Sequence, residues 1–297
     1  MTRRRRVREW GIPAAIGSAC VGVVLSLAAA AVLKGHPPGG VQRWTRTNHA
    51  GSPVTLLEGP AYAVGGVAGA LCGGAGLPAA VAGLGAGAFG ALDDLVGDSS
   101  AKGLRGHLAA ARRGKLTTGV IKILGLGVTG VATAWIADRS REREGAQSTA
   151  PVATLVGGAV IAGLANLVNL FDLRPGRALK VVLLLAVPLV AGGRGRGGSA
   201  AAAGAAAGAA IAVLPEDLAG LSMLGDSGAN SAGALLGTAL VARTDLRGRL
   251  LALATLTALT LASERVSFTE VIESSPGLRR LDALGRPARP SHGDPAP

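Results

Sequence analysis

The feature that most constrains the fold is a long stretch, from Pro60 to Leu92, that carries no charged residue. It exceeds the roughly 20 apolar residues that one helix needs to cross a bilayer. The sequence Gly73-Gly74-Ala75-Gly76-Leu77-Pro78 interrupts it with residues typical of tight turns. The stretch therefore predicts two short, glycine-rich helices joined near residues 73–78. Glycines four residues apart, such as Gly65 and Gly69, would allow close helix packing, although a glycine-rich composition also produces such spacing by chance.

Similar apolar runs recur along the chain and set its class. Hydrophobic residues make up 49% of the 297 residues and charged ones only 16%, which is too apolar for a soluble domain of this length. We expect an all-α, polytopic membrane protein with about nine transmembrane helices. Besides the two in residues 60–92, they are predicted over residues 11–33, 116–136, 151–171, 178–193, 199–214, 229–242 and 250–262.

The polar segments suggest how the chain is organised. A basic head at residues 1–10 precedes a transmembrane domain at residues 11–263, followed by a cytoplasmic C-terminal segment at residues 264–285 and a proline-rich tail at residues 286–297 that predicts disorder. The arginines of the head resemble the start of a signal peptide, but the following run is longer than a signal core, so we expect it to be retained. Nine spans would place several polar connections on one membrane side: 34–58, 93–115, 172–177, 215–228 and the segment from 264.

Charge and cysteine content exclude several classes. The formal net charge is +12, but the basic residues lie between apolar segments rather than in a patch with interleaved aromatics, so we expect lipid phosphates and an anionic substrate as partners and no nucleic acid. The two cysteines each lie within an apolar run and give no disulfide framework. Four scattered histidines make a histidine-based metal site improbable.

Acidic residues mark the exit of the long apolar run. Asp93 and Asp94 follow it directly, and Asp98 comes four residues after Asp94. Adjacent carboxylates can bind Mg²⁺ or raise one another's pKa so that one serves as a base. A solvated acidic loop at a membrane boundary is the equally simple alternative.

Two further polar motifs end or begin apolar runs. Asn166-x-x-Asn169-x-x-Asp172 places two amides on one helix face with an acid one turn beyond, although the amides could instead join neighbouring helices. Gly225-Asp226-Ser227-Gly228 opens the next run, where free backbone N–H groups suit phosphate and an acid could hold its cation. Simple N-capping by Asp226 or Ser227 is the alternative there.

In this order, the motifs resemble those of the polyprenyl-phosphate N-acetylhexosamine-1-phosphate transferases, the multi-spanning family that contains phospho-N-acetylmuramoyl-pentapeptide transferase. The resemblance covers about residues 48–285. Asp93-Asp94 looks like the family's paired aspartates after the third helix, and Lys115 is placed like the lysine that follows them. The asparagine motif and Gly225-Asp226-Ser227-Gly228 are similar to its Asn-x-x-Asn-x-x-Asp and Gly-Asp-Thr/Ser-Gly motifs.

The resemblance implies transfer of a sugar 1-phosphate from a UDP-sugar to a membrane-bound polyprenyl phosphate, with Mg²⁺ and release of UMP, in cell-envelope glycan synthesis. It implies a site facing the cytoplasm from the plasma membrane, and it leaves a homodimer open. Asp226 would be the Mg²⁺ ligand and Asp93 would act on the lipid phosphate, with Asp94 and Asp172 as further catalytic residues. The implied substrate-binding residues are Asn48, Lys115, Asn166, Asn169, Gly225 and Ser227.

Two departures from the family pattern keep a second interpretation open. Leu173-Arg174-Pro175-Gly176 follows Asp172 where the family usually has Asp-Gly-x-Asp-Gly, and Ser263–Thr269 replaces the histidine-rich loop of the muramoyl-pentapeptide enzyme. A catalytically degenerate paralogue would bind lipid carrier or nucleotide as a regulatory or scaffolding protein. A transporter is less favoured, because the acids do not lie in the middle of the apolar runs.

Overall fold

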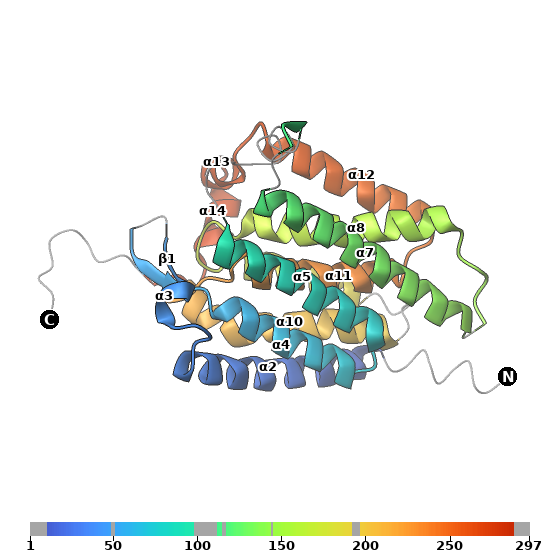
Figure 1. Cartoon of the computed structure of the whole chain (residues 1–297), viewed down its shortest axis with the longest axis horizontal. Helices are drawn as coiled ribbons and strands as arrows, with labels where there is room; N and C mark the ends of the chain where they lie inside the picture. Colours follow the sequence, from blue (N-terminus) through green and yellow to red (C-terminus); the bar gives the residue numbers. More distant parts are fainter. Residues whose placement is uncertain are drawn as a thin grey trace, which may run out of the picture.

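The computed structural model describes residues 11–48, 51–97, 112–114, 117–143, 145–191 and 197–287. Within these ranges the chain forms long helices that lie side by side in a bundle (Figure 1). They are α2 (Gly11–Gly35), α4 (Glu58–Cys72), α5 (Gly76–Val96), α7 (Thr118–Arg143), α8 (Pro151–Phe171), α9 (Arg177–Ala191), α10 (Gly197–Leu218), α11 (Gly225–Val241) and α12 (Leu246–Ser263). A helix therefore lies at each apolar run that predicts one. The basic head at residues 1–10 and the tail from residue 288 lie outside the described residues.

The expectation of nine transmembrane helices is not confirmed. Within the described residues, five helices, α2, α5, α7, α8 and α10, are long and apolar enough to cross a membrane, and α12 with the helix after it would make a sixth if that bent pair counts as one span. Helices α4 and α9 have 15 residues each and α11 has 17. At 1.5 Å per residue these lengths fall short of the roughly 30 Å apolar core of a bilayer. The chain is thus a mostly helical protein with five or six candidate membrane spans.

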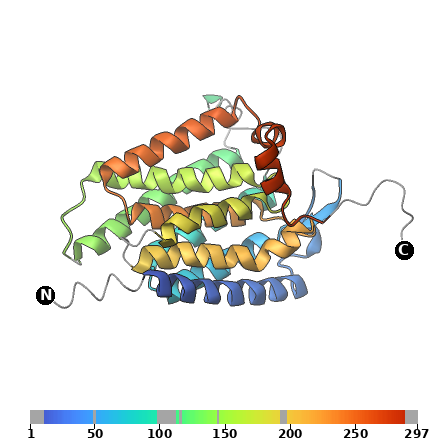
Figure 2. The ribbon, with the colours of Figure 1, turned by 180° about the vertical axis from the view of Figure 1, so that it is seen from behind.

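Two expected polar segments contain ordered structure. Residues 34–58 hold the short helix α3 (Val41–Trp44) and an antiparallel hairpin of β1 (Thr45–Thr47) and β2 (Pro53–Thr55). Residues 264–285 hold α13 (Phe268–Ser274) and α14 (Pro276–Ala283), with α12 and α13 at 87° to each other. Figures 1 and 2 show the hairpin and α13–α14 at the same end of the bundle.

Small residues let the helices approach closely. The predicted turn separates α4 from α5, with Gly74 and Gly76 at φ of +84° and +68°, a region that favours glycine. A Cβ at Gly69 would lie 2.5 Å from the carbonyl oxygen of Ser18 on α2, so the glycine spacing in α4 serves a packing role. Helix α10 packs on α2 in the same way, because a Cβ at Gly208 would overlap the backbone of Ala19.

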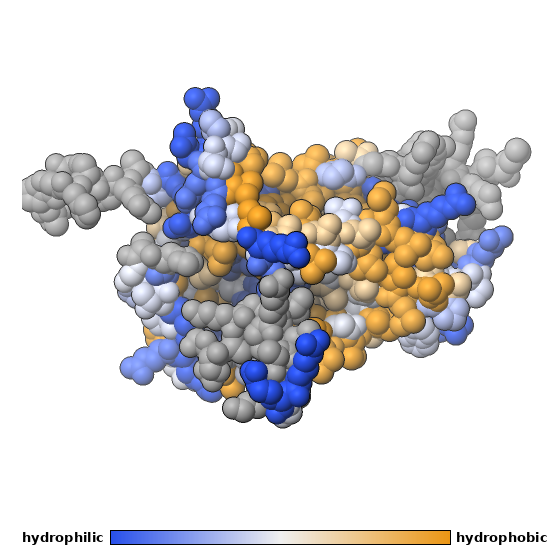
Figure 3. Space-filling model, turned by 90° about the horizontal axis from the view of Figure 1, so that it is seen from above, coloured by the Kyte–Doolittle hydropathy of each residue, from blue (hydrophilic) through white to orange (hydrophobic). Residues whose placement is uncertain are grey.

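The surface agrees with a membrane location. Figure 3 shows hydrophobic side chains over much of the visible face, with hydrophilic ones at both ends of the molecule and a few near its middle. Large apolar side chains stay exposed along the helices, among them Val24 at 62%, Val128 at 70% and Leu251 at 71%. Exposed apolar area of this extent is typical of a surface that meets lipid. The polar ends of α5, α8 and α11 meet at the hairpin end, as the sequence predicts for connections on one side.

Candidate functional site

The first turn of α11 is held by an acid from another helix. Both carboxylate oxygens of Asp94, near the end of α5, accept hydrogen bonds from α11: Oδ1 from the Asp226 N–H at 3.0 Å and Oδ2 from the Ser227 N–H at 2.9 Å. The carboxylate therefore satisfies N–H groups that a helix start leaves without partners and favours the positive end of the helix dipole. Asp94 is a structural clamp between α5 and α11 rather than part of a solvated loop. Neither Asp226 nor Ser227 supplies the N-cap, which is Leu224.

A second acid completes this helix start. Asp172, directly after α8, accepts a hydrogen bond at its Oδ2 from the Gly225 N–H at 2.7 Å. Its side chain is 5% exposed, and burial, together with the nearby Asp217 carboxylate, raises the pKa of Asp172 well above its ordinary value. Gly225 has φ of +63°, and a Cβ there would lie 3.1 Å from Asp94 Oδ2. Glycine is thus required where the two carboxylates close on α11.

Three successive N–H groups, those of Gly225, Asp226 and Ser227, therefore donate to carboxylates. A phosphate would reach these N–H groups only by displacing Asp94 or Asp172. The side chain of Asp226 points elsewhere, to a lysine.

Lys122 joins the two acids that point away from the backbone. Its Nζ lies 2.8 Å from Asp93 Oδ2 and also contacts Asp226 Oδ2. The three side chains are 16–20% exposed, so the cluster is largely buried at the ends of α5, α7 and α11. Lys122 is the single charged residue within the apolar run predicted over residues 116–136. Ionisable residues in such runs usually have a functional role, and that signal identifies Lys122 from sequence.

A cavity of about 640 Å³ lies on the other side of this helix start, where Asp172, which holds the Gly225 N–H, is one of its lining residues. Its lining includes the hairpin residue Asn48, the acids Asp172 and Asp217, and the arginines Arg174 and Arg286. Asp217 is 2% exposed and belongs to α10. The cavity thus offers both carboxylates and guanidinium groups, and the two arginines also pair with acids of the protein, Arg174 with Glu273 and Arg286 with Asp282. Such a mixed lining suits a ligand with both hydroxyl and phosphate groups.

Of the asparagine motif, only Asp172 binds the start of α11 through its side chain. Asn166 Nδ2 donates to Thr260 Oγ1 on α12 at 3.4 Å, which fits the alternative in which amides join neighbouring helices. The side chain of Asn169 is half-buried, and its backbone carbonyl accepts from the Asp172 N–H at 3.0 Å. Lys115 lies outside the described residues.

Helix α13 and the segment after α14 contribute to the cavity, which no sequence motif predicts. Arg177, at the start of α9 and 3% exposed, donates to both carboxylate oxygens of Asp282 on α14, at 2.8 and 3.1 Å. Phe171 and Phe268 stack with ring centroids 5.0 Å apart. Arg46 of the hairpin donates to the Asp94 backbone carbonyl from the other side. These contacts join segments far apart in sequence, and short local patterns carry no signal for them.

The acids are compatible with a divalent cation. Within the described residues, no group of three or more His, Cys, Asp or Glu side chains is arranged to hold a metal ion. Mg²⁺ is, however, often bound through one or two carboxylates, with phosphate oxygens and water as the other ligands. Asp93 and Asp226 already direct one oxygen each toward a single cationic group, the Lys122 ammonium. Two carboxylates that face one cation are the protein ligands that a Mg²⁺ ion shared with a phosphate would need.

The chain matches no protein-family model, and no curated protein matches it significantly.

Proposed function

We propose that the chain is a membrane-bound phosphoglycosyl transferase, which transfers a sugar 1-phosphate of the N-acetylhexosamine type from a UDP-sugar to a polyprenyl phosphate and releases UMP. The observation that carries the proposal is the convergence of Asp93, Asp226 and Lys122 at the start of α11, the helix start that Asp172 of the cavity wall also holds. The order of the sequence motifs supports the same reaction. The reaction would occur at the cytoplasmic face of the plasma membrane, because UDP-sugars are made in the cytoplasm.

Phosphoryl transfer depends on positioning and on neutralising negative charge more than on a special nucleophile of the protein. Asp93 and Asp226 would hold Mg²⁺, which when bound screens the diphosphate and favours departure of UMP. Lys122 would then pair with a phosphate oxygen. Asp94 and Asp172 act as positioning residues, because their carboxylates hold the start of α11 that carries Asp226.

The nucleotide would occupy the polar cavity. Arg174 and Arg286 in its lining suit the phosphates, and the buried carboxylate of Asp217 can accept hydrogen bonds from ribose or sugar hydroxyl groups. The polyprenyl chain would lie in the membrane against exposed apolar side chains near the same end of the bundle.

The test is UMP release from a panel of UDP-sugars with undecaprenyl phosphate and Mg²⁺. The Asp226→Asn variant should lose activity by on the order of 10²-fold or more, as when one electrostatic stabiliser of a transition state is removed. Asp245→Asn is the matched control, because Asp245 is exposed and caps α12, and asparagine caps helices equally well. Absence of UMP release with every donor, from folded wild-type protein, would refute the enzyme proposal.

Binding without turnover is the second candidate, and one observation favours it. The Lys122 ammonium already neutralises the two carboxylates that would hold Mg²⁺. A degenerate paralogue with a scaffolding or regulatory role would bind a UDP-sugar with the same affinity with and without Mg²⁺, and no donor would give UMP. Isothermal titration of UDP-N-acetylglucosamine in both conditions, beside the UMP assay, separates the two candidates.

A further inference from the structure

A second concave site lies between α7 and α8 and extends to the end of the bundle opposite Asp93 and Asp226. It is a groove of about 950 Å³, near the upper end of the range for small-molecule pockets. Apolar side chains line most of its length, among them Leu124, Val128 and Leu155, which are 61%, 70% and 58% exposed. Both helices are long and apolar enough to span a membrane, and a span would place this part of the groove against hydrocarbon.

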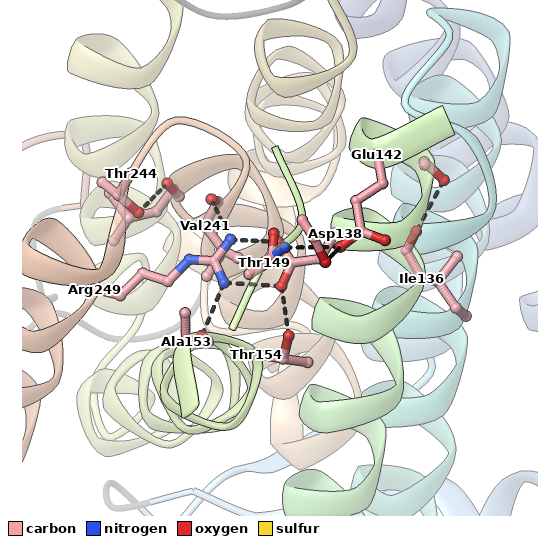
Figure 4. A network of polar contacts seen from close by, with 12 residues as sticks. Ile136, Asp138, Glu142, Thr149, Ala153, Thr154, Val241, Thr244 and Arg249 are labelled. Atoms are coloured by element: carbon pink, nitrogen blue, oxygen red, sulfur yellow. Dashed lines mark hydrogen bonds and ion pairs between the residues drawn. The ribbon is translucent and has the colours of Figure 1, made fainter. Parts of the chain in front are cut away.

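The far end of the groove is polar and preorganised. Asp138, 2% exposed, receives two hydrogen bonds from the Arg249 guanidinium, at 2.7 and 3.0 Å, and one from the Thr154 hydroxyl at 2.8 Å. Arg249 also donates to the carbonyl of Ala153 at 2.8 Å, which ties α12 to α8. Figure 4 shows these groups pointing toward one another. The network neutralises the Asp138 carboxylate and fixes the helix ends that form the mouth of the groove.

The second carboxylate at the mouth is also held by the protein. One oxygen of Glu142 accepts from the Thr149 N–H at 2.7 Å and from the Ser148 hydroxyl at 3.1 Å. Its other oxygen meets Arg139 at the longer distance of 3.4 Å. The acidic groups of the mouth are therefore satisfied within the protein.

Arg139 is the most exposed charged side chain among the residues that line the mouth. Its side chain is 60% exposed, and its guanidinium lies 5.8 Å from the ring centroid of Trp135, which is itself 54% exposed. A guanidinium has five N–H donors in a fork that matches phosphate oxygens. Tryptophan and arginine together at the end of a membrane span are typical of the headgroup level of a bilayer.

We propose that this groove binds an anionic phospholipid of the leaflet opposite the candidate site. The phosphate pairs with Arg139 beside Trp135, and the acyl chains lie along the apolar side chains between α7 and α8. Charge complementarity selects the lipid, because Arg249 neutralises Asp138, while the 60% exposed Arg139 makes only a 3.4 Å contact with Glu142 and keeps N–H donors for a phosphate. The inference does not depend on the proposed transferase reaction, since the groove mouth and the Asp93–Asp226 cluster lie at opposite ends of α7.

The test uses Trp135 fluorescence in a Trp10→Phe, Trp44→Phe background, so that Trp135 is the emitting residue, reconstituted in phosphatidylcholine nanodiscs. Brominated phosphatidylglycerol and brominated phosphatidylcholine are added at equal mole fraction. We expect stronger quenching by phosphatidylglycerol. Arg139→Gln should lower that preference about fivefold, the factor that corresponds to ~1 kcal/mol for one basic residue at an anionic membrane surface.

Two further variants make the result specific. Arg247→Gln removes an exposed charge at the same end of the bundle but outside the groove and should keep the preference. Gly127→Leu places a side chain in the groove, where a Cβ meets nothing within 4 Å, and should reduce binding of both lipids in a folded protein. Equal quenching by the two lipids in the parent protein, or equal losses in Arg139→Gln and Arg247→Gln, would overturn the proposal. So would a homodimer that Gly127→Leu abolishes without any lipid preference, since the groove would then belong to a second copy.

Discussion

The clamp by Asp94 on the start of α11 can be tested by two substitutions that differ in how much of it they remove. Alanine removes both acceptor oxygens, whereas asparagine keeps one carbonyl acceptor and no charge. In the wild type the two oxygens accept from Asp226 and Ser227 at 3.0 and 2.9 Å. Because α11 carries Asp226, this contact should support both the stability of the bundle and the geometry of the candidate site.

The expected magnitudes follow from these two bonds. A hydrogen bond to a charged group contributes about 1.5–3 kcal/mol, so Asp94→Ala should lower the free energy of unfolding by roughly 3–6 kcal/mol. Asp94→Asn should cost about half as much, roughly 1.5–3 kcal/mol, because one acceptor remains. Asp93→Asn is the matched comparison: Asp93 contacts Lys122 and not the α11 backbone, so this neighbour should cost less than Asp94→Asn.

The free energy of unfolding can be measured by SDS titration of the purified protein in mild detergent, with helicity as the readout. UMP release in the same preparations reports on the site. The clamp is refuted if Asp94→Ala unfolds within 0.5 kcal/mol of wild type, a difference typical of unremarkable surface substitutions. Equal costs for Asp94→Asn and Asp93→Asn would also refute it, since the backbone bonds would then add nothing.

Three further predictions concern packing, a buried ion pair and pH. Gly90→Ala should destabilise the folded protein by about 1–3 kcal/mol or more, because the added Cβ would overlap the backbone at the start of α11. Gly127→Ala places its Cβ in open space, so it should be neutral or stabilising by up to about 1 kcal/mol. Thermal unfolding of the two variants tests the difference. Arg249→Met should cost about 3–5 kcal/mol by stranding a buried carboxylate, and adding Asp138→Leu should recover much of that loss in the same SDS titration. Burial alone would raise the pKa of Asp282, but its arginine partner on α9 lowers that pKa below the ordinary 3.8. The ion pair therefore stabilises the docked α14 above pH 3.8, and this stabilisation is lost as the pH falls through the pKa of the folded state. Protease cleavage after α12 should therefore accelerate in acid for the wild type, while Asp282→Asn should be cleaved faster at neutral pH and respond little to acid.

The positions of the helices could be predicted because apolar runs encode them locally. Residues 151–171 form a helix over the predicted range, and the break at residues 73–78 separates α4 from α5 as expected. The number of spans could not be predicted in the same way. Short helices such as α4 and α9 are stabilised by neighbours on several sides, so their apolar character reflects burial in the bundle as much as contact with lipid.

The sequence was sufficient to predict which acids belong to the candidate site, but not what each of them does. Asp93, Asp94, Asp172 and Asp226 stand out because charge is rare at the ends of apolar runs. Their separate tasks depend on which side chain faces the α11 backbone and which faces Lys122. That orientation follows from the crossing of α5, α7 and α11, and no local pattern specifies it.

The sequence by itself determined that this chain is helical, suited to a membrane and polar at one shared end, because hydropathy and glycine spacing act over a few residues at a time. Only the tertiary structure decided that Lys122 lies between Asp93 and Asp226, and that Asp94 and Asp172 hold the start of α11. The same is true of Arg249 and Asp138, 111 residues apart, at the mouth of the α7–α8 groove. These contacts join distant parts of the chain, and they exist because small residues let several helices approach closely enough for the polar ends to meet.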